Sequence, residues 1–181
     1  MARRRRRKSR RLWNWDYTTS GFYFVTVCVE NRKKAFGDVV QDMVVLNSLG
    51  TKADKIWRMI PEHHPNVRID EHVTMPNHIH GIIVLERSNV GTLYTTSLQP
   101  SGDVSRDMGQ ISPAKGSLGV IVRTFKAAVT RWARRNGFPD FTWQARFYDH
   151  IVRDETSLEA IRNYVRNNPF TWQEDRFHPN D

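Results

Sequence analysis

The chain has 181 residues, of which 39% are hydrophobic, so it can enclose a core and does not belong to the intrinsically disordered class. Its net charge of +9 is concentrated in Arg3–Arg11, which holds eight basic residues and no acid; we therefore divide the chain into a disordered basic arm, residues 1–11, and one domain, residues 12–181. One cysteine, Cys28, excludes an internal disulfide, and no apolar run reaches the ~18 residues that cross a bilayer, so we expect a cytoplasmic protein without a membrane partner.

The first half of the domain predicts a strand, a helix and two further strands. Phe22–Glu30 is rich in β-branched and aromatic residues, as strands are. Apolar residues at helical spacing predict a helix over Leu46–Met59, which Pro61 ends. Alternating apolar and polar residues predict a strand over Asn66–Met75, and a short break separates it from another over His78–Glu86. These last two strands should pair antiparallel.

The second half predicts a loop, a helix, a strand and a final helix. Residues 88–113 are rich in Ser, Gly, Thr and Pro and predict a mobile loop. Ser117–Gly137 has the pattern of an amphipathic helix. Its basic face carries Arg123, Lys126 and Arg134. Arg146–Asp154 predicts a strand and Thr156–Pro169 a helix that opens with a capping box from Thr156 to Glu159.

The order of these elements is β-α-β-β-α-β followed by one more helix. That order predicts an α+β fold with a ferredoxin-like antiparallel sheet, helices packed on it, and an extra C-terminal helix that carries Tyr164. Folds of this class host many activities, so the function has to be argued from the site.

Two histidines open the most apolar strand of the chain. His78 and His80 are two residues apart, so their side chains project from the same face about 6.6 Å apart and could converge on one metal ion. The alternative is a pair of ordinary structural histidines, because His-x-His also occurs by chance.

The last predicted helix presents a phenol and an amide together. Tyr164 and Asn168 are four residues apart and share a helix face. The amide oxygen of Asn168 could complete a His-His-Asn set for magnesium, manganese or zinc. A phenol becomes a nucleophile when a base or a positive charge favours its phenolate, and a phosphodiester held on a metal would suit it. Alternatively, Tyr164 is a core residue and Asn168 a helix C-terminal residue before Pro169.

Several ordered blocks of the sequence resemble the single-tyrosine HUH transposases, most closely the branch of REP-associated tyrosine transposases. The resemblance runs from about Trp15 to the end of the last helix. The blocks are "YTTSGFYFVTVCVENRKKAFG", "IDEHVTMPNHIHGIIVL", "IVRTFKAAVTRWAR", "WQARFYDHIVRDE" and "IRNYVRNNPFTW".

The resemblance implies a nuclease that nicks single-stranded DNA and transfers the strand. It implies that His78, His80 and Asn168 hold a divalent metal, Mg²⁺ or Mn²⁺, and that Tyr164 forms a 5′-phosphotyrosine. The implied substrate is single-stranded or hairpin DNA near a repetitive palindrome, and the implied state is a monomer, with a dimer as the alternative. The basic side chains that we expect to bind DNA are Arg3, Arg4, Arg5, Arg6, Arg7, Arg123, Lys126 and Arg134.

Three other functions compete with this interpretation. A catalytically idle DNA-binding protein derived from a transposase would keep the fold and the basic charge. An RNA-binding ferredoxin-like module would carry aromatic residues in a Lys/Arg-Gly-Phe strand motif, which the sequence lacks. A zinc-stabilised structural domain would hold its metal in closed tetrahedral coordination and would not nick DNA.

Overall fold

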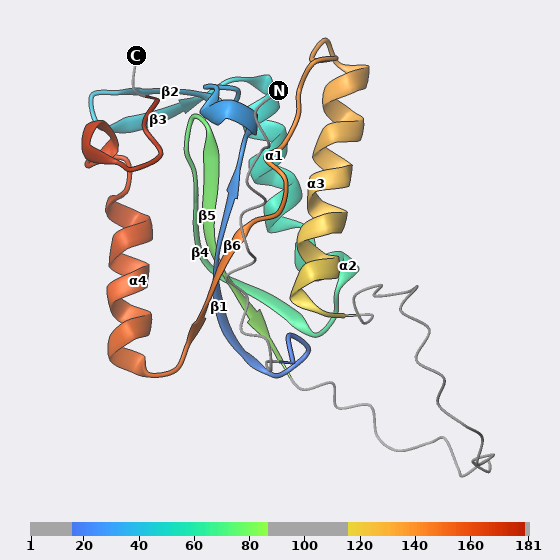
Figure 1. Cartoon of the computed structure of the whole chain (residues 1–181), viewed down its shortest axis with the longest axis vertical. Helices are drawn as coiled ribbons and strands as arrows, with labels where there is room; N and C mark the ends of the chain where they lie inside the picture. The colour runs from blue at the N-terminus through green and yellow to red at the C-terminus, as the bar shows by residue number, and fades with distance from the viewer. Residues whose placement is uncertain (1–15, 87–115, 180–181) are drawn as a thin grey trace, which may run out of the picture.

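The computed structural model describes residues 16–86 and 116–179 (Figure 1). The predicted basic arm and the predicted loop at 88–113 therefore lie outside the described residues. Within the described ranges, no helix is both long and apolar enough to cross a membrane.

A four-stranded antiparallel sheet forms the centre of the domain. Its strands stand in the order β4 (Val67–Thr74), β5 (His78–Leu85), β1 (Gly21–Cys28) and β6 (Tyr148–Val152). This order confirms the predicted α+β class and the ferredoxin-like layout, and the predicted pairing of the two strands around residue 76 is confirmed as well. The β-branched and aromatic residues of β1 and β5 put both strands at the centre of the sheet, where they are buried.

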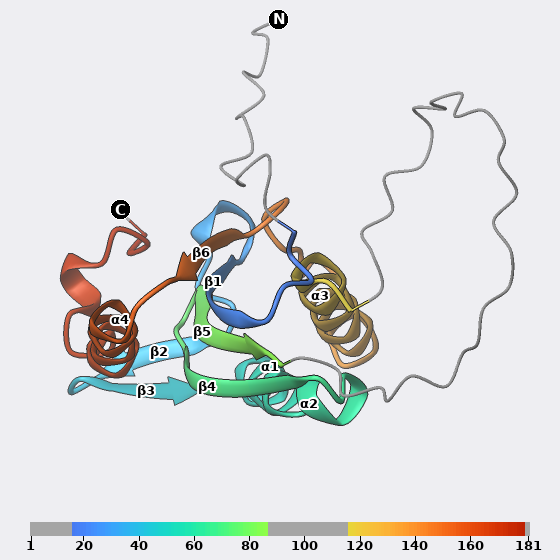
Figure 2. The same cartoon turned by 90° about the horizontal axis from the view of Figure 1, so that it is seen from below.

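Helices cover both faces of this sheet (Figures 1 and 2). On one face lie α1 (Ser48–Arg58) and α3 (Leu118–Arg135), while α4 (Glu155–Asn167) covers the other. The larger core lies under α1 and α3 and includes the rings of Trp57 and Phe125, which meet edge to face. The smaller core lies under α4. Its buried members are Phe24, Ile82, Val152, Leu158 and Val165.

A small hairpin precedes α1 and was not predicted from the sequence. It consists of β2 (Gly37–Val40) and β3 (Met43–Leu46), joined by Gln41 and Asp42, which both have positive φ. Each strand has only four residues, and the turn lacks the Asn-Gly or Asp-Gly pair that signals such a hairpin. The described residues also form two single-turn 3₁₀ helices, η1 (Glu30–Arg32) and η2 (Trp172–Glu174).

Three predicted helix boundaries differ from the structure in detail. The first helix begins after Asn47, whose side chain accepts a hydrogen bond from the Gly50 amide, because β3 continues to Leu46. Pro61 does not end the helical region; it stands in the first turn of a short second helix, α2 (Ile60–His63), where its missing N–H costs nothing. The start of α4 is the third difference.

Asp154 caps α4 in place of the predicted box between Thr156 and Glu159. Its carboxylate accepts hydrogen bonds from the backbone amide and the hydroxyl of Ser157, both at 2.8 Å. An aspartate at the N-cap also adds negative charge at the positive end of the helix dipole. The helix therefore starts at Glu155, one residue before the predicted start.

Gly81 provides a test of the larger core. A Cβ built on Gly81 would lie 2.4 Å from Cζ2 of the fully buried Trp57, and the close-packed ring cannot move away freely. Replacing Gly81 with alanine should lower the free energy of unfolding by about 1–3 kcal/mol, measured by urea denaturation. Adding Trp57→Phe should then cost less than it does in the wild type, because the smaller ring removes the clash. Equal costs in the two backgrounds would contradict this contact.

Candidate active site

The two histidines open β5 on the face that α4 covers. Both His78 and His80 are fully buried, and their ring centroids are 4.3 Å apart. Ile82 continues this face within the smaller core, while Ile79 and Ile83 point to the larger core. The strand is therefore buried on both sides, as its sequence predicted, and the imidazoles lie next to each other in the interior.

The hydrogen bonds of His78 leave one ring nitrogen free. Its Nδ1 lies 2.8 Å from Oδ1 of Asn77. The amide nitrogen of Asn77 donates to the carbonyls of Arg32 and Phe177, at 2.9 and 2.7 Å, which fixes Oδ1 as an acceptor. Nδ1 of His78 must then carry the proton, and Nε2 holds a lone pair. That Nε2 is buried without a hydrogen-bond partner among the described residues.

His80 is held between a threonine and the candidate nucleophile. Its Nδ1 lies 2.9 Å from Oγ1 of Thr26, and its Nε2 lies 3.1 Å from the hydroxyl of Tyr164. A proton on Nδ1 donated to Thr26 leaves the Nε2 lone pair facing the phenol. Both histidines then present a basic nitrogen on the side of α4, with the other nitrogen bonded to a neighbour, which is how protein ligands of metals are oriented.

Burial keeps both imidazoles neutral. Removal from water lowers the pKa of His78 to about 4, against the opposing attraction of the Asp175 carboxylate. Burial, with a smaller contribution from neighbouring His78, holds the pKa of His80 well below its usual range. Neutral imidazole is the form that binds metal ions, so the pair is in its ligand form at pH 7.

Two oxygen-bearing side chains complete the cluster. Asn168 caps the C-terminus of α4 and is buried, and its Nδ2 donates to Oδ2 of Asp175 at 2.7 Å. Oδ2 of Asp175 in turn lies 3.9 Å from Nε2 of His78. One ligand atom from each of His78, His80 and Asp175 lies within 4.8 Å of the others, so these three residues could hold a metal ion.

The donors present fit a divalent cation. Nε2 of His78 and Oδ1 of Asn168 are both buried and have no hydrogen-bond partner among the described residues, which is costly unless another ligand satisfies them. Two imidazoles with carboxylate or amide oxygens admit magnesium, manganese or zinc.

Sequence reasoning missed Asp175. It lies seven residues after Asn168, beyond Pro169, in a segment without helical or strand periodicity. The available signal was a pair of acids, Glu174 and Asp175, among the aromatic and basic residues of "WQEDRF", and such a signal is too common to select one residue.

Aromatic side chains from this C-terminal segment close over the histidines. The ring centroid of Phe177 lies 4.8 Å from that of His78 and 5.6 Å from that of His80. The ring centroid of buried Trp172 lies 6.1 Å from that of His78. The guanidinium of Arg176 stands 4.6 Å from the Phe177 ring, in a cation–π contact. These contacts remove the histidine pair from solvent.

Tyr164 lies at the boundary between this buried cluster and solvent. Its side chain is 40% exposed, and its ring meets Phe24 edge to face at 6.0 Å. Burial raises the pKa of the phenol, so Tyr164 is protonated at neutral pH and donates to His80. The structure thus brings Tyr164 beside His80, and Asn168 beside Asp175 in the same cluster.

The candidate DNA-binding side chains lie elsewhere. Arg123, Lys126 and Arg134 are on α3, which covers the opposite face of the sheet from the histidines (Figure 1). The ammonium of Lys126 donates to the carbonyls of Gln144 and Arg146, at 2.7 and 2.8 Å, and burial lowers its pKa to about 8. The arm residues Arg3, Arg4, Arg5, Arg6 and Arg7 lie outside the described residues.

A β-bulge in β4 provides two carboxylates that hold α4. Ile69 pairs with Ile83 and His72 with Gly81, so Asp70 and Glu71 together stand opposite one residue of β5. The bulge breaks the normal alternation, and both acids reach α4. There they meet two arginines that are one helical turn apart.

Each of these ion pairs uses two nitrogens of the guanidinium. Arg162 donates to the two carboxylate oxygens of Asp70, at 2.8 and 2.9 Å, and Arg166 donates to Oε1 of Glu71, at 2.8 and 2.6 Å. The hydrogen bonds from Arg162 lower the pKa of Asp70. The two ion pairs fix the position of α4 on β4. Since Tyr164 lies between the two arginines in the sequence, they also fix the position of Tyr164.

Comparison with known proteins places this arrangement in context. No family model matches the chain. An uncharacterized protein of Haemophilus influenzae strain Rd is 39% identical over 178 residues, a match that includes 95% of this chain and 93% of that protein. The chain belongs to the same family as this protein.

One solved structure has the same fold as this chain. A REP-associated tyrosine transposase, determined with a bound REP hairpin, superposes with a TM-score of 0.57 and 21% identity over 91% of this chain and 73% of its own. This chain therefore has the fold of that transposase. A candidate transposase from Deinococcus radiodurans R1 gives a TM-score of 0.47 at 13% identity, over 84% of this chain and 94% of its own.

The ion pair between Asp70 and Arg162 predicts an effect of pH on the stability of this family member. Asp70→Asn should lower the free energy of unfolding by about 1 kcal/mol at pH 7, since the pair is partly screened by solvent. Because the folded state depresses the pKa of Asp70 below 3.8, its contribution is present above about pH 4 and is lost as pH falls through the folded pKa. The free energies of unfolding of the wild type and of Asp70→Asn should therefore become equal as the pH is lowered.

Glu155→Gln is the matched control for this measurement. Glu155 also contacts Arg162, at 3.3 Å, but its side chain is 80% exposed, so the variant should unfold like the wild type. A stability difference for Asp70→Asn that stays constant from pH 7 to pH 3 would show that the carboxylate charge is not what holds the helix.

Proposed function

We propose that this protein is a metal-dependent single-stranded DNA endonuclease and strand transferase, a transposase of the single-tyrosine HUH class, that acts through a 5′-phosphotyrosine on Tyr164. The observation that carries the proposal is the 3.1 Å contact between the Tyr164 hydroxyl and Nε2 of a buried, neutral histidine, within a cluster that could bind a metal. The transposase fold is consistent with it.

The metal would be held by His78, His80 and oxygens of Asp175 or Asn168, and Nε2 of His80 would give up its hydrogen bond from the Tyr164 hydroxyl to bind the ion. Oxygen ligands beside two imidazoles suit Mg²⁺ or Mn²⁺. When bound, the ion supplies positive charge that stabilises the phosphate in its transition state and favours the phenolate of Tyr164. The residues around it orient the ligands: Asn77 and Thr26 fix the imidazole rings, and the amide nitrogen of Asn168 holds the carboxylate of Asp175.

Tyr164 would attack the scissile phosphate directly. A bond forms between the phenolic oxygen and phosphorus, and the bond from phosphorus to the 3′ oxygen breaks, so a 3′-OH leaves and takes up a proton in balance with the one the phenol loses. Attack by a second 3′-OH reverses these steps and joins the strands. The chemistry consumes neither water nor a nucleotide cofactor, because each step exchanges one phosphodiester for another.

The proposed substrate is single-stranded or hairpin DNA. The related transposase was determined with a hairpin, and the cations available here are Arg123 and Arg134 on α3, together with Arg3–Arg7 of the arm. The two ion pairs that dock α4 on its own sheet favour a monomer in which Tyr164 serves the metal site of the same chain. Such an enzyme would work on chromosomal DNA in the cytoplasm.

A DNA-binding protein without nuclease activity is the second candidate. The observation that favours it is the complete burial of both histidines beneath Phe177 and Trp172, since a phosphate must reach them for the reaction to occur. Binding without covalent chemistry would identify this function.

The role of Tyr164 can be tested by removing one oxygen atom. Tyr164→Phe keeps the ring contacts with Phe24 and His80, so folding and DNA binding should be unchanged, while the SDS-resistant protein–DNA adduct should disappear. The substrate is labelled hairpin DNA with single-stranded flanks, taken from repeats beside the gene, with and without Mn²⁺ or Mg²⁺. An adduct of wild-type yield in the Phe variant would remove Tyr164 from the mechanism.

Metal binding can be measured independently of activity by calorimetric titration with Mn²⁺. His78→Ala and Asp175→Asn should each weaken binding by at least about tenfold, because the first removes a ligand nitrogen and the second removes the negative charge of a ligand carboxylate. His63→Ala is the control, since His63 is exposed on α2, and that helix packs through Ile60 into the larger core. Unchanged Mn²⁺ affinity in His78→Ala would show that the histidine pair is structural.

A further inference from the structure

We infer that Arg176 is a further catalytic residue, whose guanidinium binds the scissile phosphate beside Tyr164 and stabilises its negative charge while the strand is cut. The inference rests on the proposed function and adds a cationic side chain to the tyrosine and the metal cluster. It is carried by an exposed guanidinium that two aromatic rings hold at the edge of that cluster.

Two aromatic rings hold the Arg176 side chain next to the site. Its guanidinium carbon lies 4.6 Å from the ring centroid of Phe177 and 5.5 Å from that of Tyr148. The ring centroid of Phe177 is 5.6 Å from that of His80, and Tyr148 meets the ring of Phe24 edge to face at 6.2 Å. The rings of His80 and Phe24 both contact the candidate nucleophile. Along each of these two routes, one ring and one neighbour separate Arg176 from the tyrosine.

The charge of Arg176 acts on the reacting groups. Burial and the Asp175 carboxylate raise the pKa of Tyr164, and the positive charge of Arg176 lowers it. Burial and the neighbouring His78 lower the pKa of His80, and Arg176 adds to that effect. A cation that acts on both the phenol and its histidine partner lies close to the place that a phosphate must occupy for attack.

The N–H donors of Arg176 are not used by the fold. Within residues 16–86 and 116–179, its guanidinium makes no ion pair and no hydrogen bond. The arginines of α4 differ, because Arg162 and Arg166 are each bound to a carboxylate of β4. A guanidinium with free donors can bind two oxygens of one phosphate at once, which the ammonium of a lysine does less well.

A turn at Asp175 sets the position of Arg176. Oδ1 of Asp175 accepts a hydrogen bond from the backbone amide of Phe177 at 2.6 Å, and the carbonyl of Phe177 accepts one from Asn77 at 2.7 Å. The backbone carbonyl of Arg176 accepts a hydrogen bond from the guanidinium of Arg32 at 2.8 Å. Three side chains therefore hold the backbone around Arg176. A cation placed in advance in this way stabilises a transition state without the cost of rearrangement.

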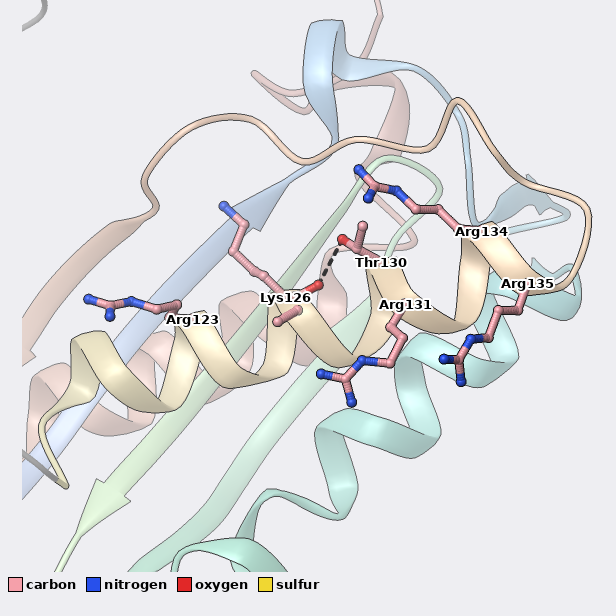
Figure 3. Close-up of a pocket in the computed structure, with 7 residues that line it drawn as sticks. Arg123, Lys126, Thr130, Arg131, Arg134 and Arg135 are labelled. Atoms are coloured by element: carbon pink, nitrogen blue, oxygen red, sulfur yellow. Dashed lines mark hydrogen bonds between the residues drawn. The ribbon is translucent and has the colours of Figure 1, made fainter.

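The basic side chains of α3 lie in the wrong place for this role. They line a groove on that helix, and Arg123 and Arg134 are among them (Figure 3). Helix α3 covers the face of the sheet opposite α4, so these arginines cannot contact a phosphate that Tyr164 attacks (Figure 2). Arg176, in contrast, lies on the side of the nucleophile.

The contact fits the chemistry of strand cleavage. The phenolic oxygen bonds to phosphorus, and the 3′ oxygen leaves and takes up a proton in balance with the one that the phenol loses. Arg176 donates N–H groups to the non-bridging oxygens and takes no part in these bond changes, because a guanidinium keeps its protons in proteins. Its contribution is electrostatic, as fixed donors stabilise the charge of a phosphate or oxyanion in other enzymes.

The test measures the single-turnover rate of adduct formation with Mn²⁺ and the full chain in excess over a hairpin DNA that the wild type cuts. Arg176→Gln should slow the reaction by about 10²-fold, the effect of removing one donor to a developing charge. Arg58→Gln is the matched control and should react like the wild type, since it removes the same charge from α1, where Arg58 pairs with Asp54.

A second substrate separates catalysis from a structural role. It carries an uncharged methylphosphonate at the scissile position, so the charge that Arg176 stabilises is missing, and the loss of rate in Arg176→Gln should be much smaller. An equal loss on both substrates would overturn the inference. Mn²⁺ affinity, measured by calorimetry, should be retained in Arg176→Gln. Weaker Mn²⁺ binding than in Arg58→Gln would show that Arg176 serves only its neighbour Asp175, and would also overturn the inference.

Binding of single-stranded oligothymidine over a salt series distinguishes failure of the inference from failure of the proposed function. In Arg176→Gln the slope of log K against log salt should fall by about 0.7, the value for one lost phosphate contact on a single strand. If the wild type forms no adduct, the nuclease proposal fails, and a reduced slope still supports the phosphate contact. If Arg176→Gln forms the adduct at the wild-type rate, the nuclease proposal stands and Arg176 is not catalytic.

Discussion

The burial of β5 on both faces is the constraint on which the rest of the structure depends. One face of the strand packs aliphatic side chains against the larger core, while the other begins with His78 and His80 and continues with Ile82. Two imidazoles placed in that interior cannot easily take up a second proton and become charged. Each of their ring nitrogens also needs a hydrogen-bond or metal partner. Side chains of residues 16–86 and 116–179 supply partners for three of the four nitrogens, and within these ranges Nε2 of His78 has none.

The position of α4 determines what these histidines can do. Its apolar residues form the smaller core, but nonpolar packing alone permits some sliding along the sheet. The bulge in β4 turns both Asp70 and Glu71 toward α4. Their directional ion pairs with Arg162 and Arg166 fix where α4 lies along its own axis relative to the sheet. The result is a phenol within hydrogen-bond distance of an imidazole from a distant strand.

Charge is distributed unequally between the two helical layers. The arginines of α4 are used to hold the helix in place, and their charges are neutralised by acids of β4 and of α4 itself. The arginines of α3 face solvent, and no described carboxylate pairs with them. Arginines therefore hold a helix in place on one face of the sheet, whereas on the other they face solvent without a described carboxylate partner.

The sequence by itself determined the four main strands, the three long helices and the shared face of His78 and His80, because these depend on short-range periodicity. It also placed Tyr164 and Asn168 one turn apart. It did not predict the β2–β3 hairpin or the Asp154 cap, where local signals were weak or competed. Only the tertiary structure brought Asp175 to the histidines, turned Asp70 and Glu71 toward α4, and separated α3 from the site, because each depends on contacts between segments far apart in the chain.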